Sequence, residues 1–322
     1  MRSLVLAQDF PWPLTSGSFL RLDAVVRALG ALGDVDLFAT VLDVRDAPCT
    51  LPAGVPVSRW TAASFPRPDY SARRRGRWLA GRLPLEVVAQ RLEGPRGELA
   101  RWARPPYDFV WCSKAPTYVG LGRPAYGPTV VDLDDLEDRK ILARIQSGAL
   151  REGRPATAAG RLHATLATAQ ARLNARRWQR LQRAIAGSVD GVAVCSDLDA
   201  RRLGWPGALV VPNGFDAPER PAGRAQVGSP PTVLFQGVLF YGPNADAVRW
   251  LVESIGPRLR RLVPDVEIRL VGAPDTPIRR LADPPRVHVT GRVPDMRPEL
   301  ERADLAVIPI RFGSGTRVKA LE

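Results

Sequence analysis

The feature that most constrains the fold is an alternation of short apolar runs with segments of helical period. Residues 19–32, for example, place apolar side chains at the three- and four-residue spacing of an amphipathic helix. Runs rich in Val, Leu and Ile that alternate with helices indicate parallel sheets covered on both faces. In the first part of the chain the runs expected to form strands are residues 2–7, 34–40, 107–113, 128–135, 190–196 and 208–214.

Helical segments in the first part are expected near 85–103 and over 137–186, the latter broken around residues 147–156. Most of 43–106 is too rich in Pro and Arg to assign. After Asn213-Gly214 comes a polar stretch with several prolines and glycines, which is typical of a domain boundary.

The alternation restarts beyond this stretch, with a helix over 244–262 opened by Asn244 and a short helix over 296–303. A strand and a turn are expected over 232–240, and further strands over 266–272, 286–291 and 304–310. The prediction is an α/β protein with two Rossmann-like domains, 1–215 and 216–322, facing each other across a cleft.

Charge and composition narrow the classes of function. The net charge of +13 favours an anionic partner. The segments 71–78 and 172–183 place Trp among Arg, which leaves three readings open: a solvated basic helix face, a membrane surface or a nucleic acid. No apolar stretch is long enough to span a bilayer, and the N-terminus lacks a signal-peptide core. We therefore expect a cytoplasmic protein, with peripheral association at the inner membrane face as the alternative.

Several kinds of chemistry are disfavoured by the residues present. The three cysteines are scattered, so they predict neither a disulfide framework nor a metal knuckle. His163 and His288 are the only histidines and have no partner nearby in the sequence, which argues against a histidine relay. The stretch Gly120 to Ala125 fits a loose dinucleotide fingerprint, but no strand leads into it and Pro124 cannot open a helix there.

Two glycine-bearing turns are the informative signals, because each follows an expected strand and precedes an expected helix. They are Ser16-Gly17-Ser18 and Gly313-Ser314-Gly315-Thr316. At such turns the backbone can approach a ligand, and helix N-termini present N–H groups to an anion. Asp132-Leu133-Asp134 has the spacing of a metal-binding pair, although acidic residues at a strand end more often cap the following helix.

Taken together, the motifs resemble those of family 4 glycosyltransferases, with the two-domain B-type fold, in the branch that builds bacterial exopolysaccharide and lipid-linked glycans. The similarity runs over nearly the whole chain. It is carried by PWPLTSGSFLRLDAVVRAL, VVDLDDLEDRK, VAVCSDLDARRL, VVPNGFD, LFQGVLFYGPNADAVRWLVESIGPRL and VHVTGRVPDMRPELERADLAVIPIRFGSGTRVKALE.

The resemblance implies a retaining hexosyltransferase that needs neither metal nor cofactor. Its donor would be a nucleotide-diphosphate sugar, its acceptor a glycan or a lipid-linked glycan, and no nucleic acid is expected as a partner. Asp134 and Asp135 would orient the acceptor.

Donor residues follow from the same resemblance. Glu322 matches the glutamate that contacts the ribose, whereas Ser314 stands where a second glutamate would contact the sugar. The usual Arg and Lys after the first strand of the second domain are missing, so Arg317 and Lys319 are the nearest candidates for the diphosphate. The full expected donor set is Ser16, Gly17, Ser18, Gly237, Tyr241, Asn244, Arg292, Val293, Gly313, Ser314, Gly315, Thr316, Arg317, Lys319 and Glu322.

These departures leave two rival readings: a non-catalytic nucleotide-binding protein with a decayed donor site, and an epimerase-like oxidoreductase. A helix expected from Arg317 onwards has no cap before residue 322. The expectation is therefore a C-terminally truncated chain with an incomplete second domain, inactive as these 322 residues.

Overall fold

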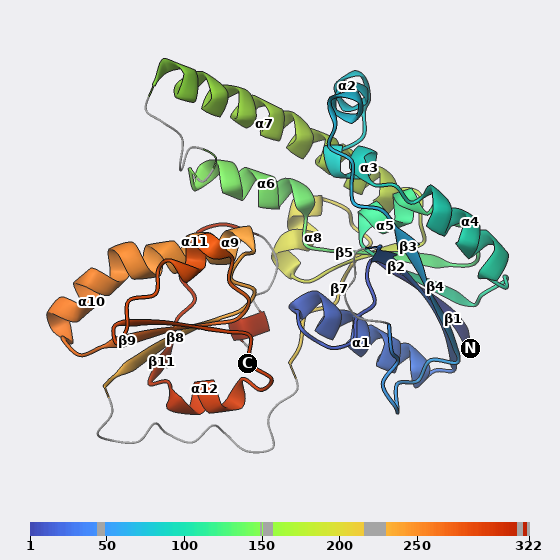
Figure 1. Ribbon diagram of the computed structural model, residues 1–322. Coiled ribbons are helices and arrows are strands. Elements are labelled where there is room, and N and C mark those ends of the chain that lie inside the picture. Colours follow the sequence, from blue (N-terminus) through green and yellow to red (C-terminus); the bar gives the residue numbers. More distant parts are fainter. Residues whose placement is uncertain (44–48, 149, 151–156, 216–229, 314–317, 321–322) are drawn as a thin grey trace. The chain divides into compact units, whose positions relative to one another are not determined.

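A computed structural model describes residues 1–43, 49–148, 150, 157–215, 230–313 and 318–320 (Figure 1). The chain divides into two compact units, Met1–Gly214 and Phe215–Gly313, and the second unit also takes in residues 318–320. They are named unit 1 and unit 2 below. The division falls one residue before the boundary expected from the sequence.

Unit 1 contains a seven-stranded parallel sheet with the strand order β3-β2-β1-β4-β5-β6-β7. The order grows outwards from β1 in both directions, as in doubly wound α/β folds. The strands are β1 Arg2–Ala7, β2 Asp34–Leu42, β3 Arg59–Phe65, β4 Phe109–Ser113, β5 Thr129–Asp134, β6 Gly191–Val194 and β7 Ala208–Val210.

Both faces of this sheet are covered. Leu4 and Leu6 of β1 pack into one hydrophobic core, and Val5 and Ala7 pack into a second core on the opposite face. The first core includes α7 and the second includes α1, which explains why the strands are apolar at successive positions. The helices are α1 Gly17–Gly30, α2 Ala72–Ala80, α3 Leu85–Ala89, α4 Glu93–Trp102, α5 Ala115–Gly120, α6 Glu137–Gln146, α7 Ala158–Ala186 and α8 Asp197–Leu203.

Unit 2 has a four-stranded parallel sheet with the order β10-β9-β8-β11. A π-helical turn, η1, joins two of its helices into one continuous segment. The strands are β8 Thr232–Gln236, β9 Glu267–Val271, β10 Val287–Gly291 and β11 Leu305–Ala306. The helical elements are α9 Gly242–Trp250, η1 Leu251–Ile255, α10 Gly256–Leu262, α11 Thr276–Arg279, α12 Arg297–Arg302 and a 3-10 turn, η2 Val318–Ala320.

The structure corrects four local expectations. Residues 43–106 hold a strand, β3, and a helix, α2, that the sequence did not indicate. The single helix expected near 85–103 is two helices, and the second has Pro95 in its first turn, where the missing N–H costs nothing. The strand expected over 304–310 pairs only through Leu305 and Ala306. The cap of α9 is Tyr241 and not Asn244.

Candidate functional site

In unit 1 a lysine and an aspartate lie side by side where two neighbouring parallel strands end. Lys114 directly follows β4 and Asp134 is the last residue of β5. Both have positive φ angles, 72° and 53°, which non-glycine residues adopt at an energetic cost. The Lys114 ammonium lies 3.1 Å from Asp134 Oδ2. Backbone strain at two adjacent strand ends, used to bring opposite charges together, is typical of functional sites.

A buried arginine, Arg21, holds the carboxylates of β5 through hydrogen bonds and ion pairs. Arg21 of α1 donates to both carboxylate oxygens of Asp132, at 2.7 and 2.8 Å, and its Nε lies 3.8 Å from Asp134 Oδ1. It also donates to the Val211 carbonyl at 2.6 Å and to Asn213 Oδ1 at 3.0 Å. Asp132 is therefore the partner of an arginine, and it is neither a helix cap nor positioned for a metal as a free ligand.

Asp134 and Asp135 are adjacent in the sequence, but their surroundings shift the pKa values of the two carboxyl groups in opposite directions. Burial acts to raise the pKa of Asp134, but the charges of Lys114 and Arg21 outweigh it and hold the pKa below its ordinary value. Burial and the Asp134 charge together raise the pKa of Asp135 to about 6. Burial acts to lower the pKa of Lys114, yet the carboxylates around it keep the pKa above the ordinary value. Asp134 and Lys114 are thus ionised at neutral pH, whereas Asp135 titrates close to it.

A cation site at the same edge fits the residues poorly. Within the described part of the chain, Asp134, Asp135 and Cys195 place potential ligand atoms within 4.8 Å of one another. Lys114 already pairs with Asp134, and Lys140 adds a second ammonium whose charge acts on Asp135. Because these ammonium groups supply the positive charge that a metal would bring, a divalent ion would be repelled there.

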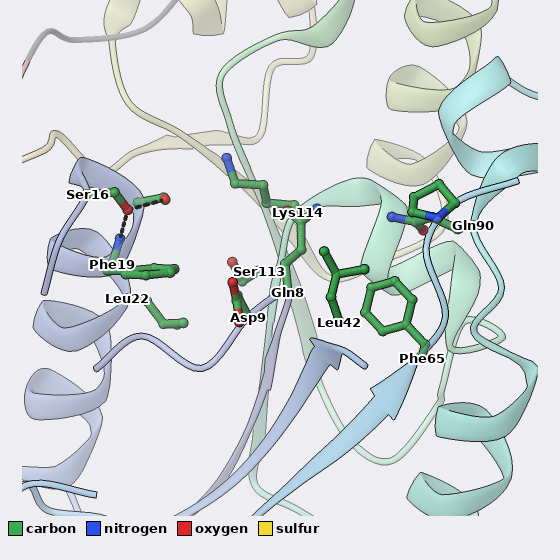
Figure 2. A pocket seen from close by; sticks show the side chains of 12 residues that line it. Gln8, Asp9, Ser16, Phe19, Leu22, Leu42, Phe65, Gln90, Ser113 and Lys114 are labelled. Atoms are coloured by element: carbon green, nitrogen blue, oxygen red, sulfur yellow. Dashed lines mark hydrogen bonds between the residues drawn. The ribbon is translucent and has the colours of Figure 1, made fainter. Parts of the chain in front are cut away.

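Beside this edge lies a cavity of about 440 Å³ at the carboxyl ends of β1 to β4 (Figure 2). Figure 2 shows α1 forming one wall with Ser16, Phe19 and Leu22, while Leu42 and Phe65 form the opposite wall. Each wall is mainly apolar, and polar groups follow the strand ends between them. The complete lining is Gln8, Asp9, Ser16, Ser18, Phe19, Leu22, Leu42, Phe65, Pro68, Gln90, Ser113 and Lys114.

The serines expected at the first turn do line this cavity. Ser16 is the N-cap of α1 and accepts a hydrogen bond from the Phe19 N–H at 3.4 Å, while its Oγ lies 3.0 Å from Ser18 Oγ. Gly17 is the first residue of α1. Arg21 and Lys114 were not among the site residues expected from the sequence. Lysine is rare in this arginine-rich chain, and that rarity was the one signal that could have drawn attention to Lys114.

In unit 2, glycines lie at the carboxyl ends of β8, β9 and β10. Gly237, Gly272 and Gly291 follow or end three adjacent parallel strands, and all have positive φ. A Cβ on Gly272 would lie 1.7 Å from the Gly237 carbonyl oxygen, so the backbones approach as closely as glycine allows. We call these three residues the glycine rim. The sequence had singled out only Gly237.

Lys319 reaches the glycine rim from the η2 turn. Its ammonium donates to the Gln236 carbonyl at 2.8 Å and to Asn244 Oδ1 at 3.0 Å, and it lies 4.3 Å from the centre of the Phe235 ring. Asn244 in turn donates to the Val238 carbonyl at 2.9 Å. A lysine distant in the sequence therefore places its charge at the turn after β8, where the sequence itself has no basic residue.

The remaining expected donor residues are less closely grouped. Tyr241 is the N-cap of α9, where its side chain makes no capping bond, and it is exposed. Arg292 and Val293 follow β10, with Arg292 exposed, and Gly313 has a φ of 126°. Ser314, Gly315, Thr316, Arg317 and Glu322 lie outside the described residues.

Part of the chain is similar in sequence to a known protein family. A family model described as "Glycosyl transferases group 1" matches residues 230–322, which covers nearly all of unit 2. No curated protein matches the chain by sequence.

Solved structures match over almost the whole chain. One described as "Trehalose-6-phosphate from E. coli bound with UDP-2-fluoro glucose" has a TM-score of 0.54 at 12% identity, covering 99% of this chain and 80% of that one. TarM has a TM-score of 0.53 at 8% identity, with coverages of 95% and 80%. A trehalose-6-phosphate synthase studied with bisubstrate glycomimetics has a TM-score of 0.53 at 10% identity, with coverages of 98% and 79%. The predicted α/β fold of two Rossmann-like units, as in B-type glycosyltransferases, is confirmed.

None of the described helices combines the length and the apolar character needed to cross a bilayer.

Proposed function

We propose that this protein is a retaining glycosyltransferase that moves a hexosyl group from a nucleoside diphosphate sugar to a glycan or lipid-linked acceptor. One observation carries the proposal: the segment that matches group 1 glycosyl transferases holds the Lys319 ammonium against the turn after β8. A cation at a glycine turn, beside the start of a helix, is suited to binding phosphate groups.

On the donor side, the diphosphate would lie over Gly237 and the first turn of α9. A Cβ at Gly237 would come within 2.9 Å of Lys319 Nζ, so a side chain there would separate the lysine from the turn. The lysine and the N-terminal end of the helix would stabilise the negative charge that develops on the leaving diphosphate as the glycosidic bond breaks. Tyr241, Asn244, Arg292, Val293 and Gly313 would complete the described unit 2 part of the donor site. Ser16, Gly17 and Ser18, also expected among the donor residues, lie in unit 1 at the start of α1, where the two serines line the cavity.

On the acceptor side, the cavity of unit 1 would hold the acceptor and Asp134 and Asp135 would orient its reacting hydroxyl group. The strained, fully charged Lys114–Asp134 pair provides a fixed hydrogen-bonding edge beside the cavity. Retention is supported by the similarity to the trehalose-6-phosphate synthase structure, which is described as giving insight into glycosyltransfer with retention. In such a reaction the donor phosphate can assist proton removal, so no protein nucleophile is needed.

The decisive experiment begins with a thermal-shift screen of nucleoside diphosphates against the whole chain. With the best ligand, Lys319→Met should weaken diphosphate binding about 10- to 100-fold, because a charge-assisted hydrogen bond contributes about 1.5–3 kcal/mol. Binding of the corresponding nucleoside should hardly change, since it lacks the phosphates.

Arg258→Met is the matched control, because Arg258 is an exposed cation of α10 in the same unit. It should leave both ligands unaffected. Equal weakening of nucleoside and diphosphate by Lys319→Met would contradict the donor assignment. Binding of the diphosphate sugar without hydrolysis or transfer would instead favour a non-catalytic nucleotide-binding protein.

A lipid-linked acceptor would also bring the protein to the inner face of the membrane. We therefore include peripheral membrane association in the proposed function, and its structural basis is developed next.

A further inference from the structure

Two segments of unit 1 contain arginines and no carboxylates. Residues 70–85, which include α2, have five arginines, and residues 157–186, which include all of α7, have six. Neither segment contains an Asp or a Glu. A solvated helix normally carries both signs of charge, which support each other at three- and four-residue spacing. Their absence over 29 residues of α7 points to an anionic partner.

The structure packs these two segments against each other. Arg177 of α7 donates to the carbonyl oxygens of Trp78 and Leu79 at the end of α2, and its guanidinium lies 4.7 Å from the centre of the Trp78 ring. Arg177 therefore binds the C-terminal carbonyls of α2 and stacks on its tryptophan. The end of α2 therefore lies beside α7 (Figure 1), and this packing brings together two segments that are separate in the sequence.

The tryptophans that suggested an interface in the sequence are not part of that surface. Trp78 is 2% exposed and Trp178 is 1% exposed. Trp178 donates to Glu86 Oε2 at 2.8 Å and belongs to the core beneath the sheet. The tryptophans therefore contribute nothing to an interface of the kind that the Arg and Trp runs suggested, because both rings face inwards, whereas arginines such as Arg75 and Arg176 face solvent.

Leucines supply the apolar part of the exposed surface instead. On α7, Leu162 is 60% exposed and Leu166 is 57% exposed. Leu162, Leu166, Ala169, Arg176 and Arg180 follow one another at three-, four- or seven-residue spacing, and all are exposed. Such spacing places them on one face of the helix, opposite the buried Trp178.

Exposed arginines and leucines also occur together in α2 and the residues that follow it. Leu79 is 63% exposed and Leu83 is also exposed, while Arg73, Arg75 and Arg77 precede them in the sequence and face solvent. We define the basic-leucine face by these exposed residues of the two segments: Arg73, Arg75, Arg77, Leu79, Arg82, Leu83, Leu162, Leu166, Ala169, Arg176 and Arg180.

We propose that the basic-leucine face docks on an anionic phospholipid surface, with the arginines at the headgroups and the leucines inserted beside them. Charge complementarity and exposed leucines beside the arginines are the two features that such an interface requires. A nucleic acid would also use the arginines, but bases stack on exposed aromatic rings, and of the three large aromatic side chains in the two segments Trp78 and Trp178 are buried and only Tyr70 is exposed. The exposed leucines fit a lipid surface better. The biological reason for docking rests on the proposed function, since a lipid-linked acceptor lies in a membrane.

Vesicle sedimentation with the whole protein tests the proposal. Vesicles with about a third phosphatidylglycerol should bind the protein, pure phosphatidylcholine vesicles should not, and binding should fall steeply with salt. Replacing Arg75, Arg77 and Arg176 by Gln should weaken binding about 100-fold, at about fivefold for each arginine. Leu79→Ser with Leu166→Ser should weaken it by about tenfold or more, with a smaller dependence on salt.

Matched controls come from unit 2. Arg258→Gln and Leu262→Ser make the same chemical changes at exposed positions of α10 and should leave vesicle binding unchanged. Each variant should keep the melting temperature and the nucleoside diphosphate affinity of the unchanged protein. Vesicle binding and nucleotide binding are separate readouts, so a failed transferase assignment would not be mistaken for a failed docking assignment.

Three results would overturn the proposal. The first is equal binding to neutral and anionic vesicles. The second is loss of binding by the control variants to the same extent. The third is tighter binding to a duplex oligonucleotide than to vesicles at the same salt, sensitive to the arginine changes and indifferent to the leucine changes, which would make this face a nucleic-acid site.

Discussion

Both candidate sites lie at the carboxyl ends of parallel strands. The site in unit 1 is formed mainly by charged side chains, whereas the site in unit 2 is formed mainly by glycine backbone. In unit 1 the strand ends carry charged side chains, and Arg21, Lys114, Asp132 and Asp134 hold one another in a buried network. In unit 2 the strand ends are the glycine rim, and the described charge there is the ammonium of Lys319.

This difference predicts how each site tolerates change. A network of buried charges is costly to break at one member, because the partner is left without compensation. A glycine rim is costly to alter wherever backbones touch, because an added side chain has no space. The first site should therefore respond to the removal of charge, and the second to the addition of bulk.

The largest expected effect is for Arg21→Met. It removes the bidentate partner of Asp132 and leaves that carboxylate buried, so the free energy of unfolding should fall by about 3–5 kcal/mol. Urea denaturation measures this. Arg297→Met in α12 removes an exposed pair with Glu301 and should cost less than about 1 kcal/mol. Similar losses for the two variants would show that the unit 1 network is not what stabilises its site.

Gly272→Ala should come next, and it tests the backbone of unit 2. The added Cβ would collide with the Gly237 carbonyl and would also occupy a positive φ of 134°, so we expect a loss of about 2–4 kcal/mol. Gly291→Ala shares the positive φ but meets nothing within 4 Å, and should cost about 1–2 kcal/mol. Thermal unfolding compares them, and equal losses would mean that the close backbone approach is unimportant.

A smaller effect, dependent on pH, is expected for Asp135→Asn. In the folded protein the Asp135 carboxyl has a pKa of about 6, above its ordinary value of 3.8, so ionisation disfavours the folded state. The cost is absent below about pH 4, grows as the pH rises towards 6 and is fully present above it. The variant should thus gain about 1–3 kcal/mol of stability at pH 7.5 and almost none at pH 4.

Asp69→Asn provides a control of opposite sign for that pH series. A hydrogen bond from the Ser71 backbone lowers the pKa of Asp69, so its carboxylate favours the folded state above the ordinary pKa. Its replacement should reduce stability at neutral pH and have no effect in acid. A gain for both variants at pH 7.5 would contradict the assignment of the raised pKa to Asp135.

The sequence predicted the fold better than it predicted the sites. Strands such as β1 and β5 are apolar runs followed by helical segments, and this local pattern was sufficient to place them. By contrast, β3 is RWTAASF, a mixed run in a region of prolines and arginines that has no clear period.

The pairing of the charged residues could not be predicted from the sequence, because the partners are far apart along the chain. Arg21 and Asp132 are 111 residues apart, and Lys319 lies 83 residues from Gln236, so no local spacing relates them. The burial of Trp78 and Trp178 could not be predicted for a similar reason. Composition showed that Arg and Trp are close in sequence, but only the helix packing decides which of them faces inwards.

The scarcity of lysine has a practical consequence for anyone who labels or immobilises this protein. Of its 46 basic residues only Lys114, Lys140 and Lys319 carry primary amines, because the rest are arginines. The carboxylates around Lys114 and Lys140 raise the pKa of both ammonium groups, which makes them poor nucleophiles near neutral pH. Succinimidyl esters used at mild pH should therefore react least with Lys114 and Lys140, with the guanidinium groups of α2 and α7 left unmodified.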